Sequence, residues 1–149
     1  MSAPTVGTDP PRSVSGAPAV SAVHHVCLTV TDQGVSERWY GQVLGLHRVM
    51  VEAHPDGGNS VVLTRPGLPF FLGIAHHPTG DGTPFAEQRT GLDHLSFAVR
   101  ERPDLDAWQA HLDACGVPHS GITERTEPFP YALIVFRDPD HIQLEVTWS

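Results

Sequence analysis

The stretch "GLDHLSFAVRERPDLDAWQ", residues 91–109, has the same layout as "AVHHVCLTVTDQGVSERWY", residues 22–40. In each, apolar and polar residues alternate over about eight positions, which predicts a half-buried strand, and a segment with helical periodicity follows. Each strand also contains a histidine, His25 in the first and His94 in the second. An offset of 69 residues aligns the two stretches, so the sequence predicts an internal repeat.

Extending this pattern predicts two βαβββ modules and an α+β fold. The first module is expected over about 22–77 and the second over about 91–148, joined by a linker at 78–90, all within one domain that spans 21–148. The expected strands are 23–30, 47–53, 59–65, 69–76, 92–99, 117–124, 130–137 and 141–148, and the expected helices are 34–45 and 103–115.

Residues that favour helix ends support these bounds. Ser36 is the expected N-cap of the first helix, and Gly45 marks its C-terminal end. Pro103 is expected to begin the second helix and Gly116 to end it.

Composition excludes several classes of function. The chain has 149 residues and a formal charge of −8, and all nine of its basic residues are arginine. Without lysine, Schiff-base chemistry and a phosphate-binding P-loop are excluded, and the acidic balance argues against a nucleic-acid partner. No apolar run is long enough to span a membrane. Residues 1–20, rich in Ala, Pro, Ser and Gly, are expected to form a flexible arm, and a cytoplasmic location is expected because they do not resemble a signal peptide.

The repeat indicates a metal site. Val26, Leu28 and Val30 form the expected core face of the first strand, so His25 lies on the opposite face. His94 has the equivalent place in the second module. A pseudo-twofold arrangement of the modules would direct both imidazoles toward one cavity.

The C-terminal stretch "RDPDHIQLEVTWS", residues 137–149, offers a third ligand. Its alternation assigns Ile142, Leu144 and Val146 to the core, which leaves Glu145 on the same side as the histidines. Two imidazoles and one carboxylate form a facial triad that binds a divalent cation and leaves positions open for water, oxygen or substrate.

Together, "VHHVCLTV", "GLDHLSFAV" and "FRDPDHIQLEV" resemble the vicinal oxygen chelate superfamily, with His25, His94 and Glu145 at its metal positions. This superfamily includes glyoxalase I, extradiol dioxygenases, methylmalonyl-CoA epimerase, fosfomycin-modifying enzymes and bleomycin-binding proteins. The resemblance implies a cup-shaped, eight-stranded mixed sheet around one divalent ion of iron, manganese, nickel or zinc. It also implies a small oxygen-rich substrate and a homodimer, sometimes with modules exchanged between chains.

The resemblance leaves a fourth ligand open. Glyoxalase-like members take it from the last strand of the first module, where this chain has Gly73 or Ala75, depending on the register, and neither residue can bind a metal. A strict offset of 69 instead aligns His76 with Glu145, although the alternation places His76 on the opposite face.

The reaction also stays open. The extradiol signature has a tyrosine and a glycine where this chain has Val135 and His141, which argues against the usual ring-cleaving mechanism. Tyr131 and His141 are the candidate catalytic acid or base groups. The expected function is a metal-dependent enzyme with dioxygenase-like or glyoxalase/lyase-like chemistry. The alternative is a metal-free protein that sequesters a cationic antibiotic or metabolite, as bleomycin-resistance proteins do.

Overall fold

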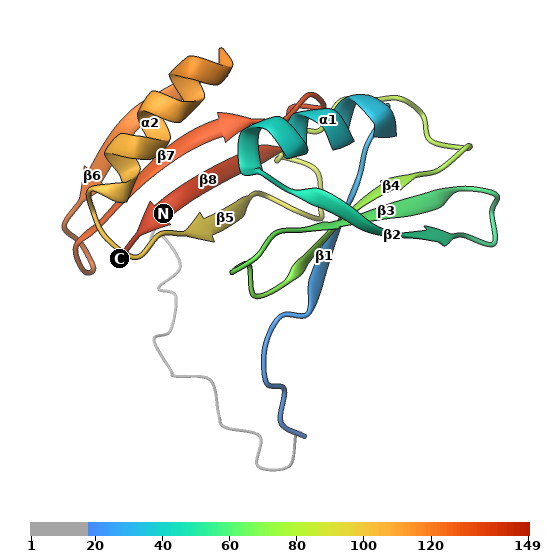
Figure 1. Ribbon diagram of the computed structural model, residues 1–149, viewed down its shortest axis with the longest axis horizontal. Coiled ribbons are helices and arrows are strands. Elements are labelled where there is room, and N and C mark those ends of the chain that lie inside the picture. Colours follow the sequence, from blue (N-terminus) through green and yellow to red (C-terminus); the bar gives the residue numbers. More distant parts are fainter. Residues whose placement is uncertain (1–17) are drawn as a thin grey trace, which may run out of the picture.

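The computed structural model describes residues 18–149, so most of the arm expected over 1–20 lies outside the described residues. Two helices and eight strands follow one another in the order of a repeated βαβββ unit (Figure 1). The elements are β1 (His25–Thr29), α1 (Gln33–Leu44), β2 (His47–Ala53), β3 (Asn59–Thr64), β4 (Phe71–His76), β5 (Leu95–Ala98), α2 (Asp104–Cys115), β6 (His119–Arg125), β7 (Tyr131–Arg137) and β8 (Gln143–Trp148).

The strands form two four-stranded sheets, one from each module, with the orders β1-β4-β3-β2 and β5-β8-β7-β6. In both sheets the first strand of the module pairs in parallel with the last, and the other pairs are antiparallel. The α+β fold with two βαβββ modules is therefore confirmed. The eight strands are divided between two sheets, because the hydrogen-bonded ladders do not join β1 to β5.

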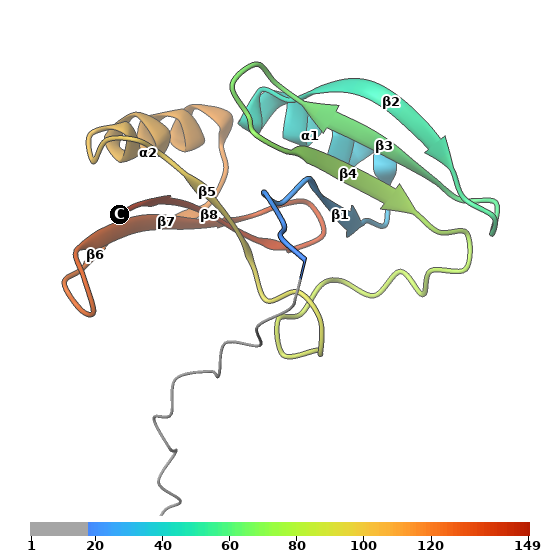
Figure 2. The ribbon, with the colours of Figure 1, turned by 90° about the horizontal axis from the view of Figure 1, so that it is seen from below.

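Both helices cover the same side of the sheets, and in the part of the chain that the structure describes no helix covers the opposite face of either sheet (Figures 1 and 2). The predicted strand alternation explains this arrangement. Leu28 and Val30 of the β1 segment are buried beneath the helices, and so are Leu144 and Val146 of β8. The buried apolar side chains of the two modules form one continuous cluster, so the modules share a core.

The helix ends agree with the sequence at three of four positions. Gly45 and Gly116 end α1 and α2 in the left-handed conformation, and Pro103 stands at the start of α2. The prediction that Ser36 caps α1 is wrong: the cap is Asp32, whose side chain accepts a hydrogen bond from the Val35 N–H. The cap lies four residues before Ser36, so Ser36 stands inside the helix and its side chain is buried.

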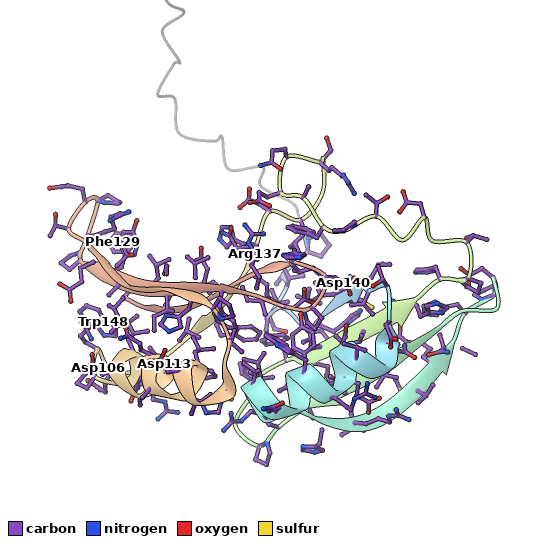
Figure 3. The ribbon with its side chains drawn as sticks, turned by 90° about the horizontal axis from the view of Figure 1, so that it is seen from above. Asp106, Asp113, Phe129, Arg137, Asp140 and Trp148 are labelled. Carbon is purple, nitrogen blue, oxygen red and sulfur yellow. The ribbon has the colours of Figure 1, made fainter. Side chains whose placement is uncertain are left out.

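The turn between β7 and β8 holds the modules together. Its Asp138 accepts a 2.9 Å hydrogen bond from the Tyr40 hydroxyl of α1, and its Asp140 accepts hydrogen bonds from the backbone and hydroxyl of Thr31. Figure 3 shows Asp140 close to the first module, at the inner end of the second. Burial is the main cause that raises the pKa of Asp138, to about 6. This junction fixes how the faces without helices are oriented.

Among the described residues, no helix is both long and apolar enough to cross a membrane.

Candidate metal centre

His94 and Glu145 lie together on the uncovered face of the second module. The ladder pairs Ser96 of β5 with Glu145 of β8, and His94 directly precedes β5. The His94 Nε2 lies 3.8 Å from a Glu145 carboxylate oxygen, and the His94 Nδ1 lies 2.6 Å from Asp93 Oδ1. The hydrogen bond to Asp93, together with the charge of Glu145, raises the pKa of His94. Because Nδ1 is hydrogen-bonded to a carboxylate, Nε2 is the nitrogen that remains for a metal. Histidines that bind metals have the same arrangement.

A chain of polar contacts reaches Glu145 from the linker between the modules. Glu87 of the linker forms a two-point ion pair with Arg137, at 2.7 and 3.3 Å. The same guanidinium donates to the side-chain oxygen of Gln143 at 3.2 Å, and the Gln143 amide donates to Glu145 at 3.4 Å. The hydrogen bond from Arg137 is the main cause that lowers the pKa of Glu87. These contacts restrict the orientation of the Glu145 carboxylate.

His25 lies on the uncovered face of the first module, as its strand position predicts. It is exposed at the start of β1, and its Nδ1 lies 3.0 Å from that of His24. A cavity of about 690 Å³ covers this face, and His25, Cys27 and Thr29 of β1 contribute to its lining. Val49, Met50 and Phe71 make the wall of the cavity partly apolar, although these side chains are between 37% and 52% exposed.

Within the single chain, the three predicted ligands do not come together. His25 lines the cavity of the first module, which neither His94 nor Glu145 reaches. In residues 18–149, only one group of three or more potential ligand side chains has its ligand atoms within 4.8 Å of one another, and that group contains none of the three. The site formed by His25, His94 and Glu145 therefore stays a prediction.

The strand register identifies the residue of the first module that is equivalent to Glu145. Cys27 pairs with Gly73 in the first module, as Ser96 pairs with Glu145 in the second. Gly73, rather than Ala75, thus has the place of the fourth ligand. His76 lines a different cavity from His25, at the end of β4 that faces the linker.

The two candidate acid or base groups lie apart from His94. Tyr131 begins β7 on the same face as Glu145, since Val135 pairs with Glu145 in the ladder. Tyr131 lies four positions along the strand from Val135, a distance of about 13 Å. His141 has a positive φ of 66° and is exposed in the turn after β7, where its carbonyl accepts from Arg137 at 2.7 Å. Their catalytic roles stay predictions.

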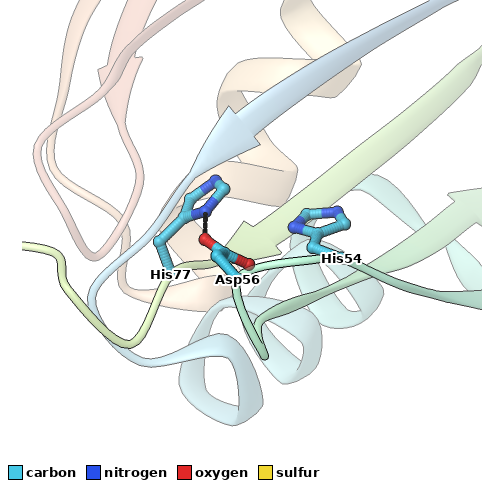
Figure 4. A group of neighbouring side chains, drawn as sticks. All are labelled: His54, Asp56 and His77. Atoms are coloured by element: carbon cyan, nitrogen blue, oxygen red, sulfur yellow. Dashed lines mark hydrogen bonds and ion pairs between the residues drawn. The ribbon is translucent and has the colours of Figure 1, made fainter.

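The structure also assembles a group that sequence reasoning missed: His54, Asp56 and His77 (Figure 4). His54 and Asp56 belong to the stretch "HPDGG", which reads as a turn, and His77 follows β4. Strand alternation could have found His77, because Gly73, Ala75 and His77 all line the cavity that contains His25.

Comparison with known proteins agrees with the fold. A sequence profile of the Glyoxalase/Bleomycin resistance protein/Dioxygenase superfamily matches residues 22–146. The protein YaeR of Escherichia coli strain K12 is 30% identical over 128 residues, covering 83% of this chain and 93% of YaeR. The crystal structure of a glyoxylase/bleomycin resistance protein/dioxygenase domain from Frankia sp. EAN1pec is 33% identical and superposes with a TM-score of 0.78, covering 88% of this chain and 99% of that domain.

A more distant structure shares the fold. The antibiotic binding protein TnmS3 from Streptomyces sp. CB03234 superposes with a TM-score of 0.63 at 20% identity, over 89% of this chain and 98% of TnmS3. The description of the matching superfamily names two enzymes, glyoxalase and dioxygenase, together with a bleomycin resistance protein. Because the profile match covers both modules and the fold agrees, the chain belongs to the Glyoxalase/Bleomycin resistance protein/Dioxygenase superfamily.

Proposed function

We propose that this protein is a metal-dependent enzyme that binds one divalent cation through His25, His94 and Glu145 and acts on a small oxygen-rich molecule. The observation that carries the proposal is the arrangement at His94. Its Nδ1 is held by Asp93, and its Nε2 lies 3.8 Å from the Glu145 carboxylate. Both side chains are oriented by hydrogen bonds, His94 to Asp93 and Glu145 to Gln143. An imidazole and a carboxylate held in this way fit a divalent cation of iron, manganese, nickel or zinc.

We further propose that two copies of the chain complete the site. The single chain keeps His25 apart from the pair formed by His94 and Glu145, while the helices leave both faces uncovered. The first of these faces exposes Val49, Met50 and Phe71. Exposed apolar side chains around a cavity are typical of an interface. In a twofold dimer, each first module can face the second module of its partner, which forms two equivalent sites.

The residues around the site suggest how a substrate is handled. A bound divalent cation supplies Lewis acidity, which lowers the pKa of a substrate hydroxyl or of a C–H next to a carbonyl. The His94 Nδ1 is hydrogen-bonded to Asp93, so this nitrogen does not bind the substrate. Val49, Met50 and Phe71 offer apolar contacts on one side of the cavity, while Thr29 and Ser60 supply hydroxyl groups for polar contacts.

Elemental analysis of protein purified without chelators or an affinity tag tests the metal site. We expect His25→Ala, His94→Ala and Glu145→Ala each to hold about one ion per chain fewer than the wild type. Circular dichroism should be unchanged, because none of the three side chains is in the core. Iron would indicate oxygen chemistry, and zinc, nickel or manganese would indicate Lewis-acid chemistry. A wild type that also fails to take up added metal would contradict the enzyme proposal.

Mixing two variants that each lack part of the site tests whether two chains share it. His25→Ala is combined with the His94→Ala/Glu145→Ala double variant, unfolded together in denaturant and refolded. If the site is shared, each mixed dimer has one intact site, and random assembly restores about a quarter of the ions that the separate variants have lost. A site within one chain would not be restored by mixing. In that case the metal lost from each variant alone would still support the ligands but not the dimer arrangement.

A metal-free binding protein is the second candidate. The cavity of about 690 Å³ is large enough for a drug-sized molecule, and it combines apolar residues with the carboxylate of Glu52. The chain has a net charge of −8, which suits a cationic ligand. Isothermal titration of metal-depleted protein with a cationic antibiotic such as bleomycin distinguishes the two: tight binding without metal favours this candidate.

A further inference from the structure

Three side chains converge where the β2–β3 turn meets the end of β4 (Figure 4). The ladder pairs Asn59 with His76, which brings the turn beside the residues that follow β4. A side chain at Gly58 is not possible there, because its Cβ would lie 2.2 Å from the His76 carbonyl oxygen. Glycine at position 58 therefore lets the β2–β3 turn lie close to the backbone at the end of β4. The turn brings His54 and Asp56 within reach of His77.

The geometry of the three side chains is compact. The His77 Nδ1 lies 2.7 Å from Asp56 Oδ2, and the ring centroids of His54 and His77 are 5.2 Å apart. The other oxygen of Asp56 accepts from the Gly58 N–H at 2.9 Å, which fixes the carboxylate. The hydrogen bond from His77 is the main cause that lowers the pKa of Asp56. One ligand atom from each of the three lies within 4.8 Å of the others.

A second observation, at His54, points to a ligand. Its Nε2 lies 2.9 Å from the hydroxyl of Ser60, a side chain that is only 5% exposed. Its Nδ1 is also buried, yet it has no hydrogen-bond partner among residues 18–149. Burying an imidazole nitrogen without a partner is costly, and metal coordination satisfies such a nitrogen. Ser60 thus orients the ring, and the unpartnered Nδ1 is the nitrogen left for an ion.

We propose that His54, Asp56 and His77 form a separate binding site for a divalent transition-metal ion of the zinc type. Two imidazoles and one carboxylate are the donors that such ions prefer, whereas magnesium and calcium favour oxygen ligands. Three protein ligands leave at least one coordination position open. His54 and His77 both line the cavity that contains His25, so an exogenous ligand can reach that position from the cavity.

This site shares no residue with the one formed by His25, His94 and Glu145, so the two can be measured independently. The His94→Ala/Glu145→Ala variant removes two ligands of the first site and leaves the new one intact. Isothermal titration of this variant, stripped of metal, is done with zinc chloride. Cobalt chloride is titrated in parallel, because the visible absorption of Co²⁺ reports its coordination. We expect about one ion per chain and a Co²⁺ spectrum typical of mixed nitrogen and oxygen ligands.

Adding Asp56→Asn or His77→Gln to that background should weaken binding at least tenfold and alter the Co²⁺ spectrum, since each change removes one ligand. Both side chains are more than a third exposed, so the fold should tolerate the substitutions. His47→Gln, an exposed histidine at the start of β2, is the matched control and should leave binding unchanged. The proposal would be overturned if the background variant bound neither ion. It would also be overturned if Asp56→Asn and His77→Gln bound as tightly as the His47→Gln control.

Discussion

The two modules have a histidine at equivalent positions, His25 at the start of β1 and His94 directly before β5, but only His94 has the carboxylate of a neighbouring strand beside it. In the second module, Ser96 pairs with Glu145, and its hydroxyl lies 2.7 Å from that of Thr147. In the first, Cys27 pairs with Gly73, and a Cβ added to Gly73 would lie 2.7 Å from the Cys27 sulfur. The thiol thus fills the space that a side chain at position 73 would need.

The first module has potential ligands elsewhere. His54, Asp56 and His77 gather at the far end of its strands, beyond the ladder that contains Gly73. The two modules resemble each other most on the buried face of their sheets, where both contribute to one core. The polar groups on the uncovered face can change, because no core packing depends on them.

The strongest test of the shared scaffold compares equivalent core residues, Leu72 in β4 and Leu144 in β8, neither of which is exposed. We expect Leu72→Ala and Leu144→Ala to lower the free energy of unfolding by similar amounts, about 3 kcal/mol each. Each variant should still unfold in one transition, because both modules contribute to a single core cluster. Urea unfolding followed by circular dichroism and tryptophan fluorescence measures this. Two separate transitions would show that the modules unfold independently.

The junction between the modules should make stability depend on pH. Burial raises the pKa of Asp138 from its ordinary value of 3.8 to about 6. The folded protein therefore binds this proton more tightly than the unfolded chain does, so the contribution of Asp138 to stability falls as the pH rises from about 4 to 6. Asp138→Asn, which stays neutral, removes this effect. Relative to the wild type, the variant should gain on the order of 2 kcal/mol between pH 4 and pH 7.

Urea titrations of both proteins at several pH values measure this gain. The difference between the two proteins is the quantity to follow, because carboxylates with lowered pKa values, such as Glu87 and Asp56, act in the opposite direction in both. Parallel stability curves would contradict a raised pKa at Asp138.

The contrast between Gly73 and Glu145 predicts unequal costs for the same change to alanine. Gly73→Ala should destabilise by about 1–2 kcal/mol, because its Cβ would crowd Cys27. Adding Cys27→Gly should recover most of that loss, whereas Glu145→Ala should change stability by less than about 0.5 kcal/mol. Thermal unfolding of the metal-depleted proteins measures the stability of Gly73→Ala, of the double variant and of Glu145→Ala. If Cys27→Gly gave no recovery, the thiol would not be what excludes a side chain from position 73.

Periodicity predicted the fold, because it reports which side of a strand is buried. It put His25, His94 and Glu145 on the strand faces opposite the core, where the structure also has them, whereas their joint role as ligands stays a prediction. It could not predict how the modules are oriented, since that depends on contacts between distant residues, such as Tyr40 with Asp138. It also missed the cluster at His54, because a turn has no periodicity and the approach of His77 comes from strand pairing.

The smallest expected effect separates the two helix starts. Asp32 caps α1 through a 2.9 Å hydrogen bond from the Val35 N–H, whereas Pro103 at the start of α2 makes no such bond. Asp32→Ala should therefore lower the free energy of unfolding by about 1 kcal/mol. Pro103→Ala should stay within about 0.5 kcal/mol of the wild type, since it removes no side-chain hydrogen bond. Urea unfolding of both variants measures the two losses in stability. Equal losses would mean that the proline contributes as much to its helix as the aspartate cap, in which case the modules begin their helices by different but equivalent means.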